Sequence, residues 1–350
     1  MTTAAETTRR ALPADLPEAW SGAAAWTGVA GGVQPWRVEP AQLERIVSPS
    51  VDDLARIPNG VRLAVETDAD RLEITLTTED SYNDAARRVD LAVDGVRVAS
   101  LEAAGRTELA FDLPGTRARV ELWLPHTAPT VLHQVLLHGA SVLVPAAPRG
   151  PRWTVHGSSI SQCNEAESPL GTWPALVAAQ NSYELTALGM SGQCHLDPPL
   201  AETVGRSAPD LVTLCFGANI YGAATFTERS VLPAMIGFVD HVRRLTRAPI
   251  VLLSTITSGP HREDEPNAAG LTQRRLRELL HHGAELLGRD DPLITSIDGT
   301  EIITQDEMHL LGDLLHPTPE GYRVMAERLA PRLAAALAEA QGEPISPAGL

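Results

Sequence analysis

The second half of the chain alternates five short apolar runs with longer stretches of helical periodicity. The runs are WTVHG, YELTALGM, DLVTLCFG, PIVLLSTI and LITSIDG. Apolar strands separated by helices form right-handed βαβ crossovers, which give a parallel sheet covered by helices on both faces. The closing helix is expected to start with Thr318 as N-cap and Pro319 in the first position, because both residues suit a helix N-terminus. This half is therefore predicted to be an α/β domain.

The first half of the chain has a different period. Between about Trp26 and Val144, apolar residues recur at every second position, as in VRLAVETD and RLEITLTT. Asp94 and Gly95 lie between two such runs, which is a strong hairpin signal because a type I′ turn needs positive φ at both central positions. Several short strands without intervening helices predict an antiparallel, jelly-roll-like β-sandwich.

The change of period divides the chain into four parts. Residues 1–20, rich in Ala, Thr and Pro, are expected to be a disordered leader. Residues 21–147 are expected to form the β-sandwich as an accessory domain, and residues 148–342 the α/β domain. Proline-rich PAAPRGPR lies at their junction, and 343–350 is expected to be a tail.

Charge and residue usage exclude several classes of function. The formal net charge is −16, which argues against nucleic acid or an anionic membrane as partner, because phosphate binding needs clustered cations. All 28 basic residues are arginine. The absence of lysine excludes Schiff-base chemistry, a pyridoxal phosphate anchor and a P-loop lysine. We expect no cofactor.

The three cysteines, Cys163, Cys194 and Cys215, form neither a disulfide framework nor a CxxC pattern. Free thiols of this kind suit a reducing compartment. The N-terminus lacks the apolar core of a signal peptide, and no run approaches the roughly 20 apolar residues that span a bilayer. We expect a cytoplasmic protein. The sequence carries no signal for its oligomeric state.

One stretch after the first apolar run of the α/β half suits a nucleophile. In WTVHGSSISQC the strand ends at Gly157, and Ser159 follows on the turn. A serine at the carboxyl end of a parallel strand is exposed in the crevice where such sheets bind ligands. Ser159 is the candidate nucleophile for attack on an ester carbonyl, although Gly-Ser-Ser also suits an ordinary loop.

A serine nucleophile needs a base, a group that orients the base, and donors for the oxyanion. His316 in DLLHPTPEGY is the candidate base, and Asp313 can reach its far ring nitrogen if the segment turns once. The donors are the N–H groups of Ser159 and Gly192, and the side-chain amide of Asn219. Taken singly, each also suits a solvated loop or a turn. Together they are expected at one edge of the sheet.

These residues resemble the four blocks of the SGNH hydrolases, also called GDSL esterases and lipases. The blocks are GSSI around Ser159, the glycine at 192, Gly217-Ala218-Asn219, and Asp313 to Pro317. The resemblance covers about 153–341 and implies a three-layer α/β/α flavodoxin-like fold, with 148–342 as the catalytic domain. It also implies Ser159, His316 and Asp313 as a catalytic triad. Ser159, Gly192 and Asn219 would then form the oxyanion hole.

The sequence departs from the family pattern at two positions. Ser158 replaces the aspartate of Gly-Asp-Ser, and Ile220 replaces the aspartate that often follows the block asparagine. HGSSISQC with a preceding β-sandwich resembles a bacterial branch of the family. That combination is similar to some carbohydrate esterases and some natural-product acyltransferases.

Other polar and aromatic residues near the blocks are open to several interpretations. Cys194, His195 and Asp197 suit a structured turn better than a metal site, so we expect no metal. The candidates for contacting substrate are Trp173, Cys194, His195 and Ile220, although core packing is the favoured role for Trp173. The charged run HREDE at 261–265 is expected to be a solvated loop.

Three functions are open at this point. The first is a serine esterase that removes an acetyl or short acyl group from a small-molecule ester through an acyl-enzyme on Ser159. The second is an acyltransferase that passes the acyl group to an alcohol, such as a natural product or a sugar. The third is a glycan-binding protein whose hydrolase half is inert.

Overall fold

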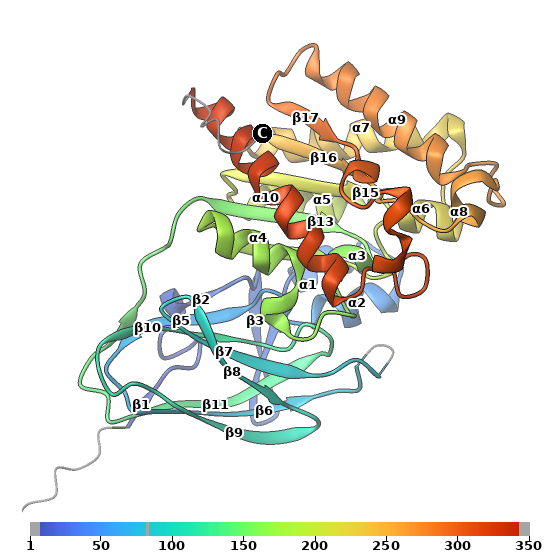
Figure 1. Ribbon diagram of the computed structural model, residues 1–350. Helices are drawn as coiled ribbons and strands as arrows, with labels where there is room; N and C mark the ends of the chain where they lie inside the picture. Colours follow the sequence, from blue (N-terminus) through green and yellow to red (C-terminus); the bar gives the residue numbers. More distant parts are fainter. Residues whose placement is uncertain (1–7, 82–83, 343–350) are drawn as a thin grey trace, which may run out of the picture. The chain divides into compact units, whose positions relative to one another are not determined.

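A computed structural model describes residues 8–81 and 84–342 (Figure 1). The chain divides into two compact units that are not contiguous in sequence. One unit contains the described residues up to Pro40, then Asp52–Pro148 and Glu167–Leu170. The other contains Ala41–Val51, Arg149–Ala166 and the described residues from Gly171.

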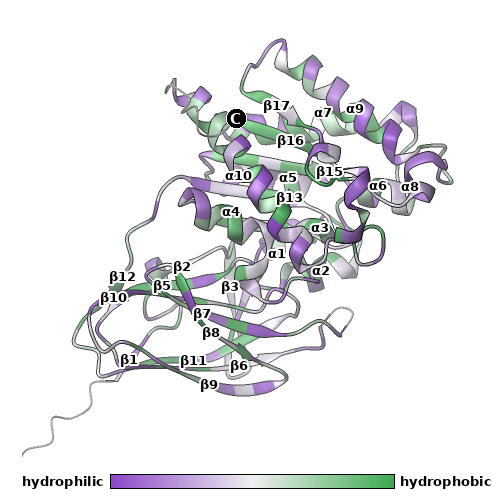
Figure 2. Ribbon diagram, in the orientation of Figure 1, coloured by the Kyte–Doolittle hydropathy of each residue, from purple (hydrophilic) through white to green (hydrophobic). Residues whose placement is uncertain are grey.

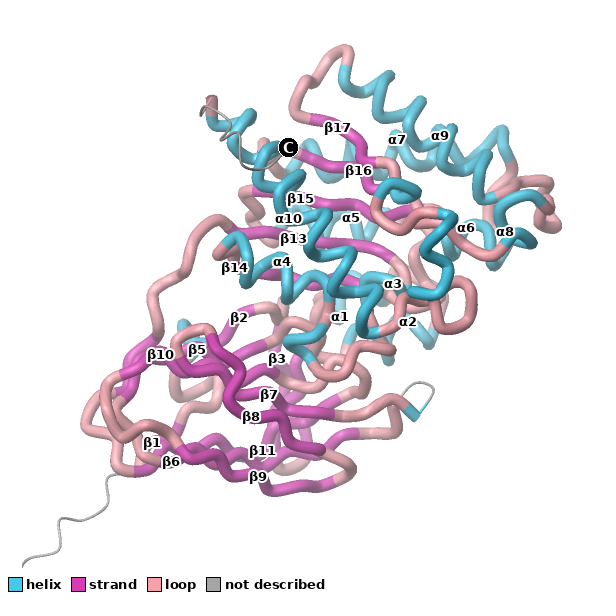
Figure 3. The backbone as a smooth tube through the Cα atoms, viewed as in Figure 1, coloured by secondary structure: helices cyan, strands magenta, loops and turns pink. Residues whose placement is uncertain are grey.

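The first unit consists of two antiparallel sheets (Figure 3). In order across the first sheet, the strands are β3 (Ala25–Val29), β4 (Gly32–Trp36), β11 (Thr130–His138), β6 (Arg71–Thr78) and β9 (Arg106–Asp112), with β1 (Arg9–Arg10) also paired to β11. In order across the second sheet, they are β12 (Leu143–Pro145), β5 (Arg62–Thr67), β10 (Ala118–Trp123), β7 (Arg88–Val93) and β8 (Val96–Glu102), with β2 (Trp20–Ser21) also paired to β5.

Alternating side chains from both sheets build one apolar core, which includes Leu63, Leu72 and Leu122. The predicted hairpin is present. Asp94 and Gly95 connect β7 to β8 with φ of 49° and 87°. The prediction of an all-β region before the α/β domain is confirmed.

Two expectations for the first half of the sequence are wrong. Residues 8–20 are not a disordered leader, because β1 pairs with β11, the 3-10 helix η1 (Pro17–Ala19) follows it, and Ala11 and Leu12 are buried in the core. The half is also not free of helices, since it contains α1 (Pro40–Leu43) and α2 (Pro49–Ala55). Residues 1–7 and the expected tail at 343–350 lie outside the described residues.

The second unit is built on a parallel sheet of five strands. Their order is β14 (Glu184–Gly189), β13 (Arg152–Gly157), β15 (Leu211–Phe216), β16 (Ile250–Ser254) and β17 (Ile294–Ile297). The first strand in sequence, β13, has β14 on one side, and β15, β16 and β17 follow in order on the other side. The crevice at such a reversal is where open α/β sheets bind ligands.

Helices cover both faces of this sheet, with α4 and α10 on one face and α5, α7 and α9 on the other (Figure 1). The helices are α3 (Ser159–Gln162), α4 (Trp173–Asn181), α5 (Pro198–Arg206), α6 (Ala218–Ala223), α7 (Glu228–Leu245), α8 (Pro260–Asp264), α9 (Gln273–Gly288) and α10 (Pro319–Gln341). The 3-10 helices of this unit include η4 (Gly299–Glu301) and η5 (Gln305–Leu310), whereas η3 (Pro169–Gly171) has its first two residues in the first unit. The three-layer prediction is confirmed.

Local sequence explains the ends and faces of these helices. The Thr318 hydroxyl accepts a hydrogen bond from the Gly321 N–H at 3.2 Å, and Pro319 takes the first helical position of α10, as predicted. Met325, Leu329 and Leu333 of α10 are buried at helical spacing. Figure 2 shows mainly hydrophobic strands in this sheet, whereas α9 alternates between hydrophilic and hydrophobic positions. None of the helices in the described residues has the length and apolar character needed to cross a bilayer.

The expected solvated loop HREDE instead contains a buried ion pair. Glu263 on α8 and Arg277 on α9 are hydrogen-bonded through both carboxylate oxygens, and their side chains are only 6% and 9% exposed. Glu263 Oε1 also accepts hydrogen bonds from the N–H of Ser258 at 3.0 Å and from its hydroxyl at 3.1 Å. The pair therefore fixes the segment that follows β16.

Removing one partner of this pair is expected to destabilise the protein. Glu263→Ala leaves Arg277 as an unpaired buried charge, which costs about 3–5 kcal/mol. Asp264→Ala is the matched control, because Asp264 pairs with Arg274 at a site where both side chains are more than half exposed. Its cost should stay below about 1 kcal/mol. Urea unfolding measures both, and equal losses would contradict the structural role of Glu263.

Candidate active site

The turn that presents Ser159 depends on two glycines and a serine cap. A Cβ at Gly157 would lie 2.4 Å from Ser161 Oγ, and a Cβ at Gly189 would lie 2.3 Å from the backbone nitrogen of Gln162. Glycine at both positions lets α3 approach the sheet this closely. The Ser158 hydroxyl accepts a hydrogen bond from the Ile160 N–H at 3.3 Å and caps α3. Ser159 is then the first residue of the helix.

Ser159, His316 and Asp313 form one hydrogen-bonded chain. Ser159 Oγ lies 2.7 Å from His316 Nε2, and His316 Nδ1 lies 2.7 Å from Asp313 Oδ2. An ionised carboxylate can only accept, so Nδ1 of the ring is the donor to Asp313. In the neutral ring, Nε2 is then the acceptor that faces the Ser159 hydroxyl.

Asp313 is held as a carboxylate in this chain. Burial favours its protonated form, but hydrogen bonds from the His316 backbone and ring, the charge of His316 and the Leu315 N–H outweigh burial and lower the pKa of Asp313. Asp313 Oδ1 accepts from the N–H groups of His316 at 2.7 Å and Leu315 at 3.1 Å. The same carboxyl group therefore shapes the loop and orients the imidazole.

The loop that carries His316 is itself tied to neighbouring segments. Gly312 N–H donates to the His316 carbonyl at 2.9 Å, and Leu311 pairs with Pro317 across the loop. Gly259, which follows β16, donates its N–H to the Leu314 carbonyl at 2.8 Å. These backbone hydrogen bonds hold the loop in place and thereby position the side chains of Asp313 and His316.

Gly192 and Asn219 follow the strands on either side of β13. Gly192 comes three residues after β14, and Asn219 three residues after β15, so both lie at the edge of the sheet that carries Ser159. Gly192 has φ of +70°, and no atom lies within 4 Å of where its Cβ would be. Asn219 Oδ1 accepts from the Cys194 N–H at 3.0 Å. This contact occupies the amide oxygen and turns the amide NH₂ group away from Cys194.

Two of the candidates for contacting substrate are in the core, which is the role favoured for Trp173. Trp173 is fully buried, packs on Trp153 with ring centroids 5.8 Å apart, and donates from Nε1 to the Ile160 carbonyl at 3.0 Å. The Cys194 thiol is buried 3.7 Å from His156 Nε2, and burial raises its pKa well above the usual value. Trp173 supports α3 from behind, and Cys194 contacts the site only through its backbone.

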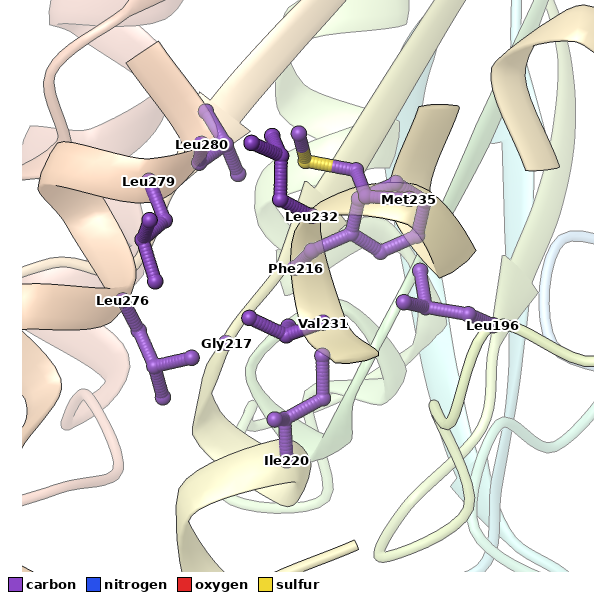
Figure 4. Close-up of a pocket in the computed structure, with 10 residues that line it drawn as sticks. All are labelled: Leu196, Phe216, Gly217, Ile220, Val231, Leu232, Met235, Leu276, Leu279 and Leu280. Carbon is purple, nitrogen blue, oxygen red and sulfur yellow. The ribbon is translucent and has the colours of Figure 1, made fainter. Parts of the chain in front are cut away.

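Ile220 is also buried, and it lines a small apolar cavity of about 20 Å³ (Figure 4). Gly217 and Ile220, which flank Asn219 in sequence, form one end of this cavity together with Leu196. Phe216 at the end of β15 and side chains of α7 and α9 form the rest: Val231, Leu232, Met235, Leu276, Leu279 and Leu280. Ile220 on α6 is thus buried and faces this cavity, among the apolar side chains that line it.

His195 lies between the Gly192 loop and the end of α6. Its Nε2 is 2.9 Å from the Gly192 carbonyl oxygen and its Nδ1 is 2.9 Å from Thr225 Oγ1. Cys194, His195 and Asp197 therefore do not converge on a common point. Across residues 8–81 and 84–342, no group of three His, Cys, Asp or Glu side chains is placed to hold a metal ion.

Sequence reasoning missed several polar contacts that hold the site together. Asn164 Nδ2 donates to Ser191 Oγ at 3.2 Å, next to Gly192. The buried Tyr322 hydroxyl donates to Glu165 Oε2 at 2.9 Å, which links α10 to the segment after α3. The CNE run at 163–165 immediately after the nucleophile helix was the one local signal for these contacts.

Comparisons with known proteins agree with this architecture. Residues 155–324 match the GDSL-like Lipase/Acylhydrolase family, and residues 18–133 match the N-terminal domain of SsfX3. A search of curated proteins found no match.

Among solved structures, salicylyl-acyltransferase SsfX3 from a tetracycline biosynthetic pathway is 27% identical, with a TM-score of 0.83 over 95% of this chain and 97% of that one. A family two carbohydrate esterase from Clostridium thermocellum is 14% identical, with a TM-score of 0.66 over 92% and 99% of the two chains. An acetyl xylan esterase from the rumen bacterium Butyrivibrio proteoclasticus is also 14% identical, with a TM-score of 0.64 over 95% and 99%. Residues 155–324 of this chain thus belong to the GDSL-like lipase/acylhydrolase family, behind an N-terminal domain of the SsfX3 type.

Proposed function

We propose that this protein transfers acyl groups from small-molecule esters through an acyl-enzyme on Ser159. The observation that carries the proposal is the hydrogen-bonded chain from Ser159 Oγ through the His316 ring to Asp313. A serine hydroxyl is a weak nucleophile unless a base lies within hydrogen-bond reach and is itself oriented by a third group. The geometry meets both requirements.

The first half of the reaction uses these groups in sequence. Ser159 Oγ bonds to the ester carbonyl carbon while its proton passes to His316 Nε2. Asp313 stabilises the imidazolium that forms, without taking the proton. The carbonyl oxygen becomes an oxyanion that accepts hydrogen bonds from the N–H groups of Ser159 and Gly192 and from the Asn219 amide. The intermediate then breaks the ester C–O bond, and the proton on Nε2 goes to the departing alcohol.

The second half repeats these steps with a new nucleophile. Water attacks the acyl-serine while His316 Nε2 takes the water proton. The acyl C–Oγ bond then breaks as that proton returns to Ser159 Oγ, which releases the carboxylic acid and free Ser159. This gives a serine esterase, and we propose acetyl or another short acyl group as its substrate. The open space beside Gly192 supports access of an ester to this edge of the sheet.

One observation favours acyl transfer as a second candidate. The similarity to salicylyl-acyltransferase SsfX3 extends over almost the full length of both chains. In a transferase an acceptor alcohol, such as a hydroxyl of a natural product or sugar, takes the place of water in the second half. The third candidate is a glycan-binding protein with an inert hydrolase half. It is disfavoured because both hydrogen bonds of a working triad are present.

Ser159→Ala is expected to abolish both turnover of p-nitrophenyl acetate and covalent labelling by a fluorophosphonate, because it removes the atom that forms the acyl-enzyme. The neighbouring Ser158→Ala is the matched control. It removes a helix cap worth about 1 kcal/mol but should retain labelling at Ser159. Absorbance of the released p-nitrophenol measures turnover, and mass spectrometry of the labelled peptide measures labelling in both variants. Labelling or turnover that survives in Ser159→Ala would refute the assignment.

Asn219→Ala is expected to lower kcat by about 10²–10³-fold with a much smaller change in KM, which is the usual effect of losing one oxyanion donor. Steady-state kinetics with p-nitrophenyl acetate measures the loss, and circular dichroism checks that the fold is retained. An unchanged kcat in a folded variant would remove Asn219 from the oxyanion hole.

Hydrolysis and transfer differ in their products. With an activated acyl ester and a panel of candidate alcohols, an esterase should release free acid at a rate that the alcohols do not change. A transferase should instead accumulate the new ester at the expense of the acid. Chromatography of the products decides between them, with Ser159→Ala as the blank for uncatalysed transfer.

A further inference from the structure

We infer that His195 is a positioning residue for the oxyanion hole, because it clamps the Gly192 backbone to the end of α6, the helix that carries Asn219. The inference rests on the proposed function. It assigns no direct contact between His195 and the substrate.

The two contacts of His195 define its role. A carbonyl oxygen can only accept, so His195 Nε2 donates its proton to the Gly192 carbonyl at 2.9 Å. In this neutral tautomer Nδ1 is the acceptor, and it accepts a hydrogen bond from the Thr225 hydroxyl at 2.9 Å. Thr225 comes after Ala224, the C-cap of α6, and is bound to the helix by a hydrogen bond from its N–H to the Ile220 carbonyl at 3.3 Å.

One backbone hydrogen bond, from the Gln193 N–H to the Met190 carbonyl at 3.0 Å, spans Gly192, and His195 adds a restraint on the Gly192 carbonyl itself. Gly192 is exposed, it has the positive φ that glycine adopts freely, and no atom lies within 4 Å of its Cβ position. An oxyanion donor works only when its N–H lies about 2.7–3.1 Å from the developing charge. With the Gly192 carbonyl held by His195 and the preceding Ser191 hydroxyl held by Asn164, the backbone around the Gly192 N–H is fixed on both sides.

The same loop is joined to α6 at a second point, where the Cys194 N–H donates to Asn219 Oδ1 at 3.0 Å. The two bridges lie on consecutive residues, Cys194 and His195, and both end on α6 or its C-terminal turn. Together they keep the Gly192 N–H and the Asn219 amide at a constant separation. His195 therefore acts on the geometry of two donors at once, although it contributes neither of them.

His195→Ala is expected to lower kcat on p-nitrophenyl acetate by about tenfold with little change in KM, since a small displacement of a catalytic group lowers the rate without changing ground-state binding. His195→Gln should recover most of the loss, because the glutamine amide can donate to the Gly192 carbonyl and accept from Thr225. His282→Ala on α9 is the matched control, since His282 is an exposed histidine outside the site. Its kcat should equal that of the wild type.

Phenylboronic acid separates positioning from general support of the fold, because its tetrahedral adduct on Ser159 places a hydroxyl in the oxyanion hole. Its inhibition constant should rise in His195→Ala by about the same factor as kcat falls, and should recover in His195→Gln. An unchanged kcat, a rise in KM alone, or a Gln variant as poor as Ala would each overturn the inference. If instead the wild type shows no turnover that depends on Ser159, the proposed function fails, and that result is distinct from a failure of the clamp.

Discussion

The close approach of α3 to the parallel sheet is the constraint on which the rest of the site depends. Gly157 and Gly189 lie opposite each other at the ends of β13 and β14, and a side chain at either position would collide with α3. With α3 seated there, Ser159 lies at the reversal of strand order, flanked by the loops that follow β14 and β15. The neighbouring loops then bring Gly192 and Asn219 to the same edge.

His316 is far from Ser159 in the sequence, and several hydrogen bonds hold its imidazole at this edge of the sheet. Asp313 binds two backbone N–H groups as well as the ring of His316, so the loop and the imidazole are shaped by one carboxyl group. Tyr322 on the following helix is bonded to Glu165, which stands just after α3. This hydrogen bond is a second connection between the segment that carries Ser159 and the segment that carries His316.

Much of the fold could be predicted from periodicity. The features predicted correctly are those set by neighbouring residues in the sequence. The five parallel strands, the Asp94-Gly95 hairpin and the Thr318 cap follow from patterns within a few residues. The edge-strand pairing of Arg9 and Arg10 depends on β11, more than a hundred residues away, and no local pattern predicts it. Likewise, the HREDE run looks solvated because its charges are adjacent in sequence, while the partner that buries Glu263 lies on another helix.

The candidate site was predictable to a similar degree. Ser159, Asp313, His316, Gly192 and Asn219 could be selected because each follows a strand or precedes a capped helix, and the structure gathers the first three into one hydrogen-bonded chain. The direction of a side chain was not predictable. Cys194 is close to the site in sequence, but its thiol is buried in the core, whereas for Trp173 core packing was the favoured role. His195 was selected as a substrate contact, whereas its bonds to Gly192 and Thr225 give it a structural task.

The hydroxyl cap of Ser158 has a consequence for how the nucleophile turn responds to its surroundings. A carboxylate there would place a negative charge one residue before Ser159, close to where a second negative charge develops on the carbonyl oxygen. A hydroxyl caps the helix without adding charge and does not ionise in water at ordinary acidity. The turn therefore presents its nucleophile through a neutral contact whose strength is independent of proton concentration.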